Sequence, residues 1–451
     1  MSRTVLVNAV IATASRTGKG ALAIDGERIA GIWFRDETET DDSRALASSE
    51  GAQVIDLQGK VLMAGGIDAH VHFRDPGLTH KADIESESKA AVLGGITSFI
   101  DMPNTIPPTV TKETLEDKLK VAAGKSWANY GFNLGATNDN FEAITRYLSE
   151  GFGHSIGGIK VFMGSSTGNM LVDRQETLDK LFSIREKPIL IHSEDEGMIK
   201  RNMAAASEKF GEAIPFGMHP EIRSRKACIM STIKALELAI DHGTALHVLH
   251  VSTSEEVEMI RAAKIHNQKI TAETSANYLW FCDEDYERLG SRMKCNPAVK
   301  SAKDRAALRK ALKEGLIDTI GSDHAPHLLS EKDRPYSSCP SGVPSIQQSI
   351  SVAFTLGMPL ERIASAYSEK TAEIFGIKDR GSLKTGNFAD LVVIDPDEEF
   401  TVRGTDCKCG WTPYEGERLK GAVKMVWGNG SLAAKDGAIV SERSAKALFF
   451  K

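Results

Sequence analysis

The pattern of hydrophobic and polar positions changes twice along the chain. Near the amino terminus, apolar and polar side chains alternate in residues 4–13, 21–34 and 52–57. The alternation returns in residues 386–396 and 421–437. Asp25-Gly26 divides one of these runs as a β-hairpin turn does. We therefore predict a small β-sandwich domain built from both chain ends, with residues 1–57 as its first part and residues 381–451 as its second.

The long middle of the chain has a different pattern. Short apolar runs alternate with longer amphipathic segments, which is typical of repeated β-α units around a parallel sheet. The strand candidates are residues 65–73, 97–103, 130–136, 157–163, 188–194, 245–252, 270–276 and 318–326. Eight such units favour a (β/α)₈ barrel of the TIM type over residues 58–380, with a doubly wound open sheet as the alternative. In such a barrel, functional groups gather at the carboxyl ends of the strands.

The composition excludes several classes of function. Of the 451 residues, 55 are Lys or Arg and 61 are Asp or Glu, so the formal net charge is −6. A slightly acidic chain has no general attraction to nucleic acid, and no stretch approaches the ~20 apolar residues of a membrane span. The six cysteines include no CxxC pair, and we expect reduced thiols. We therefore expect a cytoplasmic protein that binds neither nucleic acid nor membrane.

Histidines stand on several strand candidates or at their carboxyl ends. His70 and His72 are separated by one residue, so both imidazoles lie on one face of the first barrel strand and can bind one metal ion. His192 and His250 lie on the fifth and sixth candidates. The place of the His-x-His pair at the end of the first strand favours a metal site.

Lys160 is expected to project from the fourth strand candidate into the same barrel mouth. An ammonium ~4 Å from a divalent ion is repelled by roughly 8 kcal/mol at an effective dielectric of ~20. Two resolutions are open at this point. The side chain turns away to an acidic partner, or it reacts with carbon dioxide to form an anionic carbamate whose oxygens can bridge two metals.

Asp323 stands at the end of the eighth strand candidate, in the run IGSDHAPH. Its carboxylate can ligate a metal or act as a general base, and capping a helix is the alternative. Together with the histidines and Lys160, it offers hard and borderline ligands that suit Zn²⁺. Two such ions ~3.5–4 Å apart can share a hydroxide and make a nucleophile available at neutral pH.

At this point the residues resemble a known family. The His-x-His pair, the strand-four lysine, the two later histidines and the final aspartate are similar to the metal site of the amidohydrolase superfamily. Within it, longer motifs resemble the dihydroorotases, which are cyclic amidohydrolases of pyrimidine synthesis. These motifs are DAHVHFRDPG (68–77), DMPNTIPPT (101–109), SDHAPH (322–327) and CGWTPYEG (409–416). The resemblance covers nearly the whole chain.

The resemblance implies the reversible, zinc-dependent hydrolysis of L-dihydroorotate to N-carbamoyl-L-aspartate. The implied metal ligands are His70, His72 and Asp323 for one zinc ion, His192 and His250 for a second, and carboxylated Lys160 as the bridge. A hydroxide between the metals is the implied nucleophile, and Asp323 is its proton shuttle. The implied substrate contacts are Arg74, Asn104 and His327 for the carboxylate and Asn296 for the ring.

The physical case for Arg74 stands apart from the resemblance. An always-charged planar guanidinium suits a carboxylate, and an ion pair with the neighbouring Asp75 or with another acidic residue is the alternative interpretation.

Three positions depart from the family pattern. Many relatives carry an aspartate where this chain has Lys160. The motif often written NPPLR is Asn296-Pro297-Ala298-Val299-Lys300 here, which keeps the charge without its bidentate geometry. Relatives often show two histidines where this chain has Asn277-Tyr278, a position that is not a metal ligand of the family.

Two rival functions stay open on the sequence. A hydantoinase or allantoinase has the same scaffold, but Arg74 and Asn104 together favour a substrate that carries a carboxylate. The second rival is a non-catalytic amidohydrolase-like scaffold. Such proteins are expected to lose metal ligands, whereas this chain retains every matching position. The superfamily resemblance also makes a homo-oligomer the expected assembly.

Overall fold

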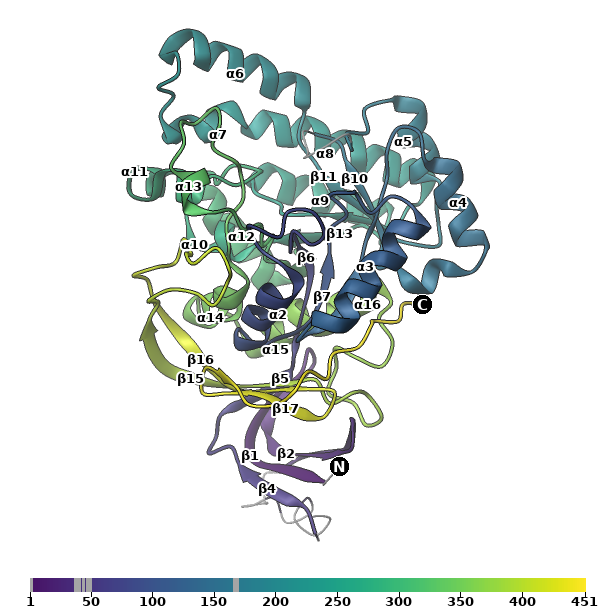
Figure 1. Cartoon of the computed structure of the whole chain (residues 1–451), viewed down its shortest axis with the longest axis vertical. Coiled ribbons are helices and arrows are strands. Elements are labelled where there is room, and N and C mark those ends of the chain that lie inside the picture. The colour runs from purple at the N-terminus through teal and green to yellow at the C-terminus, as the bar shows by residue number, and fades with distance from the viewer. Residues whose placement is uncertain (1–2, 36–41, 43–44, 46–50, 165–169) are drawn as a thin grey trace.

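The computed structural model describes residues 3–35, 42, 45, 51–164 and 170–451, and it places a barrel of alternating strands and helices above a β-rich region (Figure 1). The barrel strands are β6 (Gly66–Val71), β7 (Ile96–Asp101), β8 (Asn129–Phe132), β9 (Leu134–Gly135), β10 (Ile159–Phe162), β11 (Ile189–His192), β12 (Leu246–Val248), β13 (Thr271–Thr274) and β14 (Thr319–Ile320). Each predicted strand overlaps at least one of them, and several of these runs, such as β6, β7 and β11, are buried along their whole length, as strands of a parallel sheet are.

The barrel strands run parallel and close into a ring. Strands β6, β7 and β8 form one sheet and β9 to β14 form another. The amide of His72 donates to His324 O at 2.8 Å, and the amide of Gly157, just before β10, donates to Phe132 O of β8 at 3.0 Å, so hydrogen bonds cross both seams. The predicted (β/α)₈ barrel is therefore confirmed.

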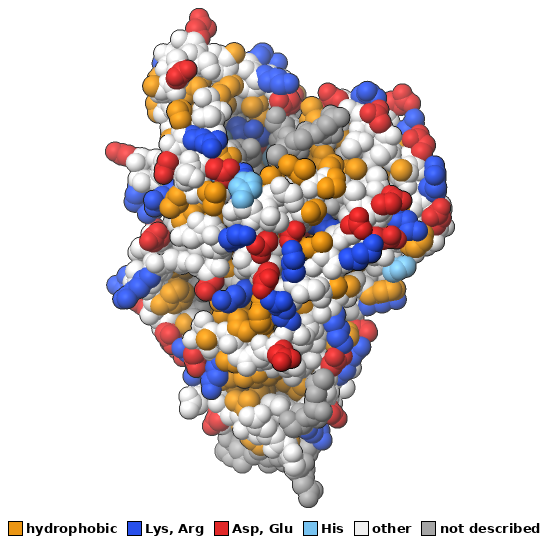
Figure 2. Space-filling view, viewed as in Figure 1, with side chains coloured by type: hydrophobic (Ala, Val, Ile, Leu, Met, Phe, Trp, Pro, Cys, Tyr) orange, Lys and Arg blue, Asp and Glu red, His pale blue; other side chains and the backbone are white. Residues whose placement is uncertain are grey.

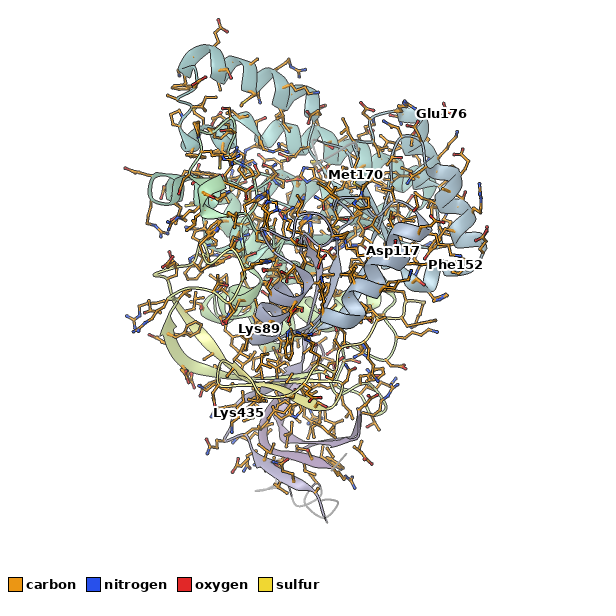
Figure 3. The ribbon with its side chains drawn as sticks, viewed as in Figure 1. Lys89, Asp117, Phe152, Met170, Glu176 and Lys435 are labelled. Atoms are coloured by element: carbon orange, nitrogen blue, oxygen red, sulfur yellow. The ribbon has the colours of Figure 1, made fainter. Side chains whose placement is uncertain are left out.

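Helices cover the outside of the barrel and the loops above it. They are α2 (Ile84–Leu93), α3 (Lys112–Lys125), α4 (Phe141–Ser149), α5 (Gln175–Phe182), α6 (Glu196–Phe210), α7 (His219–Ile222), α8 (Arg225–His242), α9 (Ser254–His266), α10 (Ala276–Trp280), α11 (Tyr286–Leu289), α12 (Ala302–Glu314), α13 (Leu329–Lys332), α14 (Ser349–Thr355), α15 (Leu360–Ala364) and α16 (Lys370–Phe375). Their outer faces are polar: Asp117 and Glu176, labelled in Figure 3, are exposed side chains of α3 and α5. Their inner faces pack on the strands, as amphipathic helices do.

Both chain ends contribute strands to one sheet below the barrel. These strands are β1 (Thr4–Ala12), β2 (Thr17–Asp25), β3 (Arg28–Phe34), β4 (Gln53–Asp56), β5 (Val61–Ala64), β15 (Leu391–Thr401), β16 (Arg418–Gly428), β17 (Ser431–Lys435) and β18 (Ala438–Ile439). Among the described residues the order is β18-β17-β16-β15-β5-β1-β2-β3, with β4 paired to β1. Strand β5 joins the two chain ends, which confirms a β-rich domain built from both; the domain boundaries stay predictions.

The carboxyl-terminal tail closes the end of the barrel opposite the predicted site. The amide of Leu448 donates to the carbonyl of Tyr130, near the start of β8, at 2.8 Å. Leu448 and Phe450 are buried in one apolar cluster with the barrel residues Ile67 and Ile100. Apolar side chains therefore fill much of the amino-terminal end of the barrel, and the candidate site residues lie at the other end.

Two further predictions concern the chain as a whole. The six cysteines, all of which the structure describes, are buried free thiols. Within the described part of the chain, no helix is both long enough and apolar enough to cross a membrane.

Candidate active site

The His-x-His pair meets Asp323 at the carboxyl end of the barrel. His70 is the fifth residue of β6, and His72 follows its last residue. The Nε2 atoms of His70 and His72 lie 3.4 and 3.3 Å from Asp323 Oδ1. Although burial alone raises the pKa of Asp323, His70, His72 and His250 hold it well below its usual value. Two imidazoles and one ionised carboxylate therefore converge on one point, which is the donor set of a zinc site.

Each of these imidazoles is held from its far side. Glu273 Oε1, on β13, lies 2.6 Å from His70 Nδ1, and Asn104 Oδ1 lies 2.7 Å from His72 Nδ1. Burial alone raises the pKa of Glu273, but His70 and His247 lower it to about 2. Acceptors at both Nδ1 atoms fix the tautomers and leave the Nε2 lone pairs facing Asp323, which is the state that a metal requires.

His192 and His250 form the second group of candidate ligands. His192 ends β11, and its Nδ1 lies 2.9 Å from His250 Nε2. Glu194 Oε2 lies 2.9 Å from His192 Nε2, and Arg223 donates to both oxygens of Glu194. Burial lowers the pKa of both histidines, so both are neutral. Among the described residues, His250 Nδ1 is buried without a hydrogen-bond partner.

Lys160 lies on β10 between the two groups of ligands in the strand order and is almost completely buried. Its Nζ is 4.6 Å from the centre of the Phe162 ring. Burial lowers the pKa of Lys160 to about 7, against the opposing effects of Asp323 and Glu273. A large fraction of the side chain is therefore a neutral amine at neutral pH, which is the form that reacts with carbon dioxide.

Three site residues have left-handed backbones. The φ angles of Arg74, His250 and Asp323 are 64°, 38° and 48°. Such conformations are uncommon for residues other than glycine and persist where the surrounding structure imposes them. All three stand just beyond barrel strands, so the strain coincides with the predicted site.

The predicted carboxylate contacts Arg74 and His327 lie together and close in the chain to the candidate metal ligands His72 and Asp323. Arg74 is buried, its Nη2 is 3.2 Å from His327 Nε2, and its Nε donates to Pro326 O at 3.2 Å. Asp75, the alternative partner of Arg74, instead pairs with Lys125 at 3.3 Å. The Oδ1 atom of Asn296, the predicted ring contact, is buried and unpartnered among the described residues.

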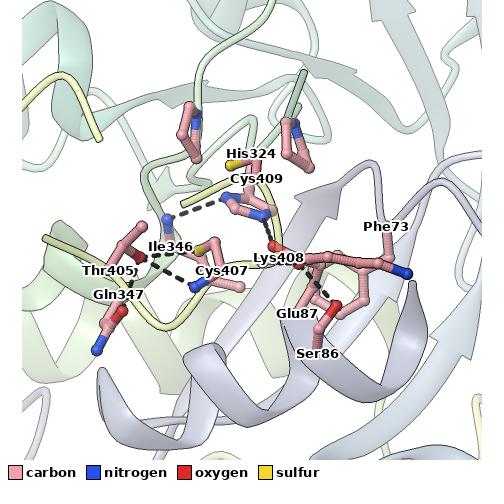
Figure 4. Close-up of polar contacts among 12 residues, drawn as sticks. Phe73, Ser86, Glu87, His324, Ile346, Gln347, Thr405, Cys407, Lys408 and Cys409 are labelled. Atoms are coloured by element: carbon pink, nitrogen blue, oxygen red, sulfur yellow. Dashed lines mark hydrogen bonds and ion pairs between the residues drawn. The ribbon is translucent and has the colours of Figure 1, made fainter. Parts of the chain in front are cut away.

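A buried polar network surrounds His324, the residue that follows Asp323 in the chain (Figure 4). His324 Nε2 donates to Glu87 Oε2 at 2.6 Å, and His324 Nδ1 accepts from the amide of Ser345 at 3.0 Å. The amide of Lys408 donates to Glu87 Oε1 at 2.9 Å. Glu87, His324 and Cys407 are close enough to suggest a metal site. Since the lone pair of His324 Nδ1 accepts from a backbone amide and its Nε2 carries the donated proton, His324 has no lone pair free for a metal ion, and the network serves to anchor the loop that carries Asp323.

Sequence reasoning missed the residues that hold the ligands. Glu273 and Glu194 orient His70 and His192, Arg223 fixes Glu194, and Lys81 lies 3.1 Å from His327 Nδ1. The sequence contains a signal for Glu273, because it is a charged residue within a strand that is expected to be buried, and a buried charge needs a partner. Arg223 lies on the insertion between β11 and β12, far from any motif.

The surface is hollowed between α6 and α5, the helices that follow β11 and β10, which carry His192 and Lys160 (Figure 2).

Comparisons with known proteins identify the family to which the chain belongs. Residues 61–433 match the model of the amidohydrolase family. The chain is 34% identical over 414 residues to a dihydroorotase of Methanosarcina acetivorans, and the alignment covers 86% of both proteins. It is 31% identical over 402 residues to an allantoinase of Streptomyces avermitilis, and that alignment covers 86% of this chain and 87% of the allantoinase. The structure resembles an L-hydantoinase (dihydropyrimidinase) from Arthrobacter aurescens, with a TM-score of 0.90, 26% identity and full coverage of both chains. The chain thus belongs to the amidohydrolase family, and it is a cyclic amide hydrolase related to the dihydroorotases.

Proposed function

We propose that this cyclic amide hydrolase is a zinc-dependent dihydroorotase, which interconverts L-dihydroorotate and N-carbamoyl-L-aspartate in pyrimidine biosynthesis. The observation that carries the proposal is the buried guanidinium of Arg74 beside His327, close to the metal ligands. Dihydroorotate carries an exocyclic carboxylate, whereas hydantoin and allantoin rings are neutral. A buried cation that forms no ion pair among the described residues suits the charged substrate.

The donor set fits a pair of zinc ions. We assign one ion to His70, His72 and Asp323, and the second to His192 and His250, with carboxylated Lys160 between them. Neutral imidazoles, ionised Asp323 and the low pKa of Lys160 support this assignment. When bound, the ions supply a Lewis acid for the ring carbonyl and a nucleophilic water at neutral pH.

The side chains of the protein transfer the proton and position the substrate. Asp323 accepts the proton of the attacking water and delivers it to the departing ring nitrogen, serving first as base and then as acid. Arg74, Asn104 and His327 hold the exocyclic carboxylate so that the scissile carbonyl meets the nucleophile. The unpartnered Oδ1 of Asn296 accepts a hydrogen bond from a ring N–H. Asn104 Oδ1 already holds His72, so only its Nδ2 donor is available to substrate.

The test is the turnover of dihydroorotate, hydantoin and allantoin, each at equal concentration, by purified protein loaded with zinc in bicarbonate buffer. We expect a strong preference for dihydroorotate that chelation abolishes. A preference for a neutral ring would overturn the proposal.

Hydantoin or allantoin hydrolysis is the second candidate function. It is favoured by the similarity to the allantoinase and to the hydantoinase structure, both of which align with most of this chain. The same assay separates the two candidates. A cytoplasmic location and a homo-oligomeric assembly complete the proposal, and cell fractionation and light scattering test them.

A further inference from the structure

Two cations lie on either side of the His327 imidazole. Arg74 and Lys81 belong to the same loop between β6 and α2, which turns through hydrogen bonds from the amide of Leu78 to Arg74 O and from the amide of Lys81 to Leu78 O, both 3.0 Å. Arg74 Nη2 is 3.2 Å from His327 Nε2, and Lys81 Nζ is 3.1 Å from His327 Nδ1. The imidazole therefore faces a donor group at each nitrogen.

Lys81 is the partner of Nδ1. Glu331 Oε1 lies 2.8 Å from Lys81 Nζ and balances its charge. Glu331 Oε2 accepts from the amide of Leu328 at 3.0 Å, and it is 3.7 Å from His327 Nδ1, too far for a hydrogen bond. Since an ammonium group can only donate, Nδ1 must accept from Lys81.

The proton of the neutral imidazole is consequently on Nε2. Burial, Arg74 and Lys81 hold the pKa of His327 far below its usual value, so the ring carries one N–H. Its Nε2–H donates to Ser341 O, 3.1 Å away. The other tautomer would turn an N–H toward the ammonium of Lys81 and leave Ser341 O without this donor.

This tautomer leaves two donors side by side. Arg74 Nη2 and the protonated Nε2 of His327 are 3.2 Å apart, and neither can accept from the other. An oxygen of a carboxylate can accept from Arg74 Nη2 and can share the Nε2–H of His327 with Ser341 O in a three-centre hydrogen bond. The geometry points to Lys81 as a positioning residue: it fixes His327 as a donor and thereby makes the enzyme prefer a substrate that carries a carboxylate. This inference rests on the proposed dihydroorotase function.

The kinetic test compares Lys81→Met with the wild-type enzyme on dihydroorotate and hydantoin. We expect KM for dihydroorotate to rise about tenfold, the effect of losing one charge-assisted hydrogen bond, with kcat nearly unchanged. The kinetics on hydantoin should not change, and Lys81→Arg should restore most of the affinity for dihydroorotate. Lys120→Met is the matched control, because Lys120 also pairs with a carboxylate (Asp117, 3.0 Å) but is exposed.

A second test reads the tautomer directly. In protein labelled with ¹⁵N at histidine, the His327 signal, assigned by its loss in His327→Gln, should show protonated Nε2 and unprotonated Nδ1. Lys81→Met should mix the tautomers, an effect that a purely structural lysine would not produce.

The outcomes separate the two proposals. If the wild type does not hydrolyse dihydroorotate, the proposed function fails. If it does, but Lys81→Met keeps the wild-type KM, the role of Lys81 is wrong. A wild-type spectrum with protonated Nδ1 overturns that role even if Lys81→Met fails to fold.

Discussion

The two halves of the barrel mouth are built differently. In the metal half, the imidazoles stand on or next to strand ends, and Glu273 of β13 and Glu194 just after β11 orient His70 and His192. In the carboxylate half, Arg74 and His327 stand on loops, held by a lysine and by backbone carbonyls. Anionic neighbours thus favour cation binding in one half, and cationic neighbours favour anion binding in the other.

From this difference we infer that one half of the mouth determines the reaction and the other half determines which substrate is used. On the proposed assignment, rigid strand ends hold the groups that carry out amide hydrolysis, which enzymes acting on different rings can share. On the same assignment, loops hold the groups that distinguish one ring from another. We therefore expect substitutions in the metal half to affect all substrates alike, and substitutions in the carboxylate half to affect only charged substrates.

The largest effect is expected at Asp323. Replacing Asp323 by Asn removes the proton shuttle while leaving an oxygen ligand, so kcat should fall about 10²–10⁴-fold on dihydroorotate and hydantoin alike. Steady-state kinetics and metal analysis of the same preparation check this. Asp117→Asn, an exposed change on α3, is the control. Near-normal turnover with metal bound would refute the shuttle role.

A smaller effect is expected from Glu194→Gln. The change removes the charge that holds His192 and leaves Arg223 buried without its counter-ion. The affinity for the second zinc ion should fall by about 10–100-fold, as measured by competition with a chromophoric chelator. Glu176→Gln alters an exposed ion pair with Lys180 and should leave the affinity unchanged. Equal affinities in Glu194→Gln and wild type would show that Glu194 does not support the site.

The smallest effect concerns the pH dependence of stability and depends on His219, a buried histidine outside both halves. His219 Nε2–H donates to Cys295 O at 2.8 Å, beside Asn296, and its Nδ1 accepts from the Tyr336 hydroxyl at 2.7 Å. Burial holds the pKa of His219 well below 6.5, so the folded protein keeps it neutral. Below about pH 6.5 the unfolded chain binds the extra proton, so the free energy of unfolding falls as pH falls, by up to about 1.4 kcal/mol per pH unit.

Denaturant unfolding between pH 5 and 7 measures this slope. His219→Gln should flatten it below about pH 6.5, whereas His266→Gln, an exposed change at the end of α9, should not. An unchanged slope in His219→Gln would contradict a neutral buried imidazole.

In both halves, the side chains that converge at the barrel mouth could be predicted from the sequence, whereas the side chains that hold them could not. The spacing of His70 and His72 on a strand determines that they share a face, whatever the rest of the chain does. The support of His327 depends on Lys81, which lies 246 positions earlier in the chain, and no local pattern brings the two together. The left-handed backbones of Arg74, His250 and Asp323 are likewise imposed by tertiary structure rather than by residue type.

The most direct test of this account is the ratio of kcat/KM for dihydroorotate to that for hydantoin, measured for zinc-loaded wild type and for Arg74→Ala. We predict that the wild type strongly prefers dihydroorotate. We also predict that Arg74→Ala loses this preference about 10–100-fold through KM, because a buried charge-assisted pair is removed while the metal half stays intact. A ratio that is unchanged by Arg74→Ala, or a wild type that prefers hydantoin, would contradict the assignment of this half of the mouth to a carboxylate.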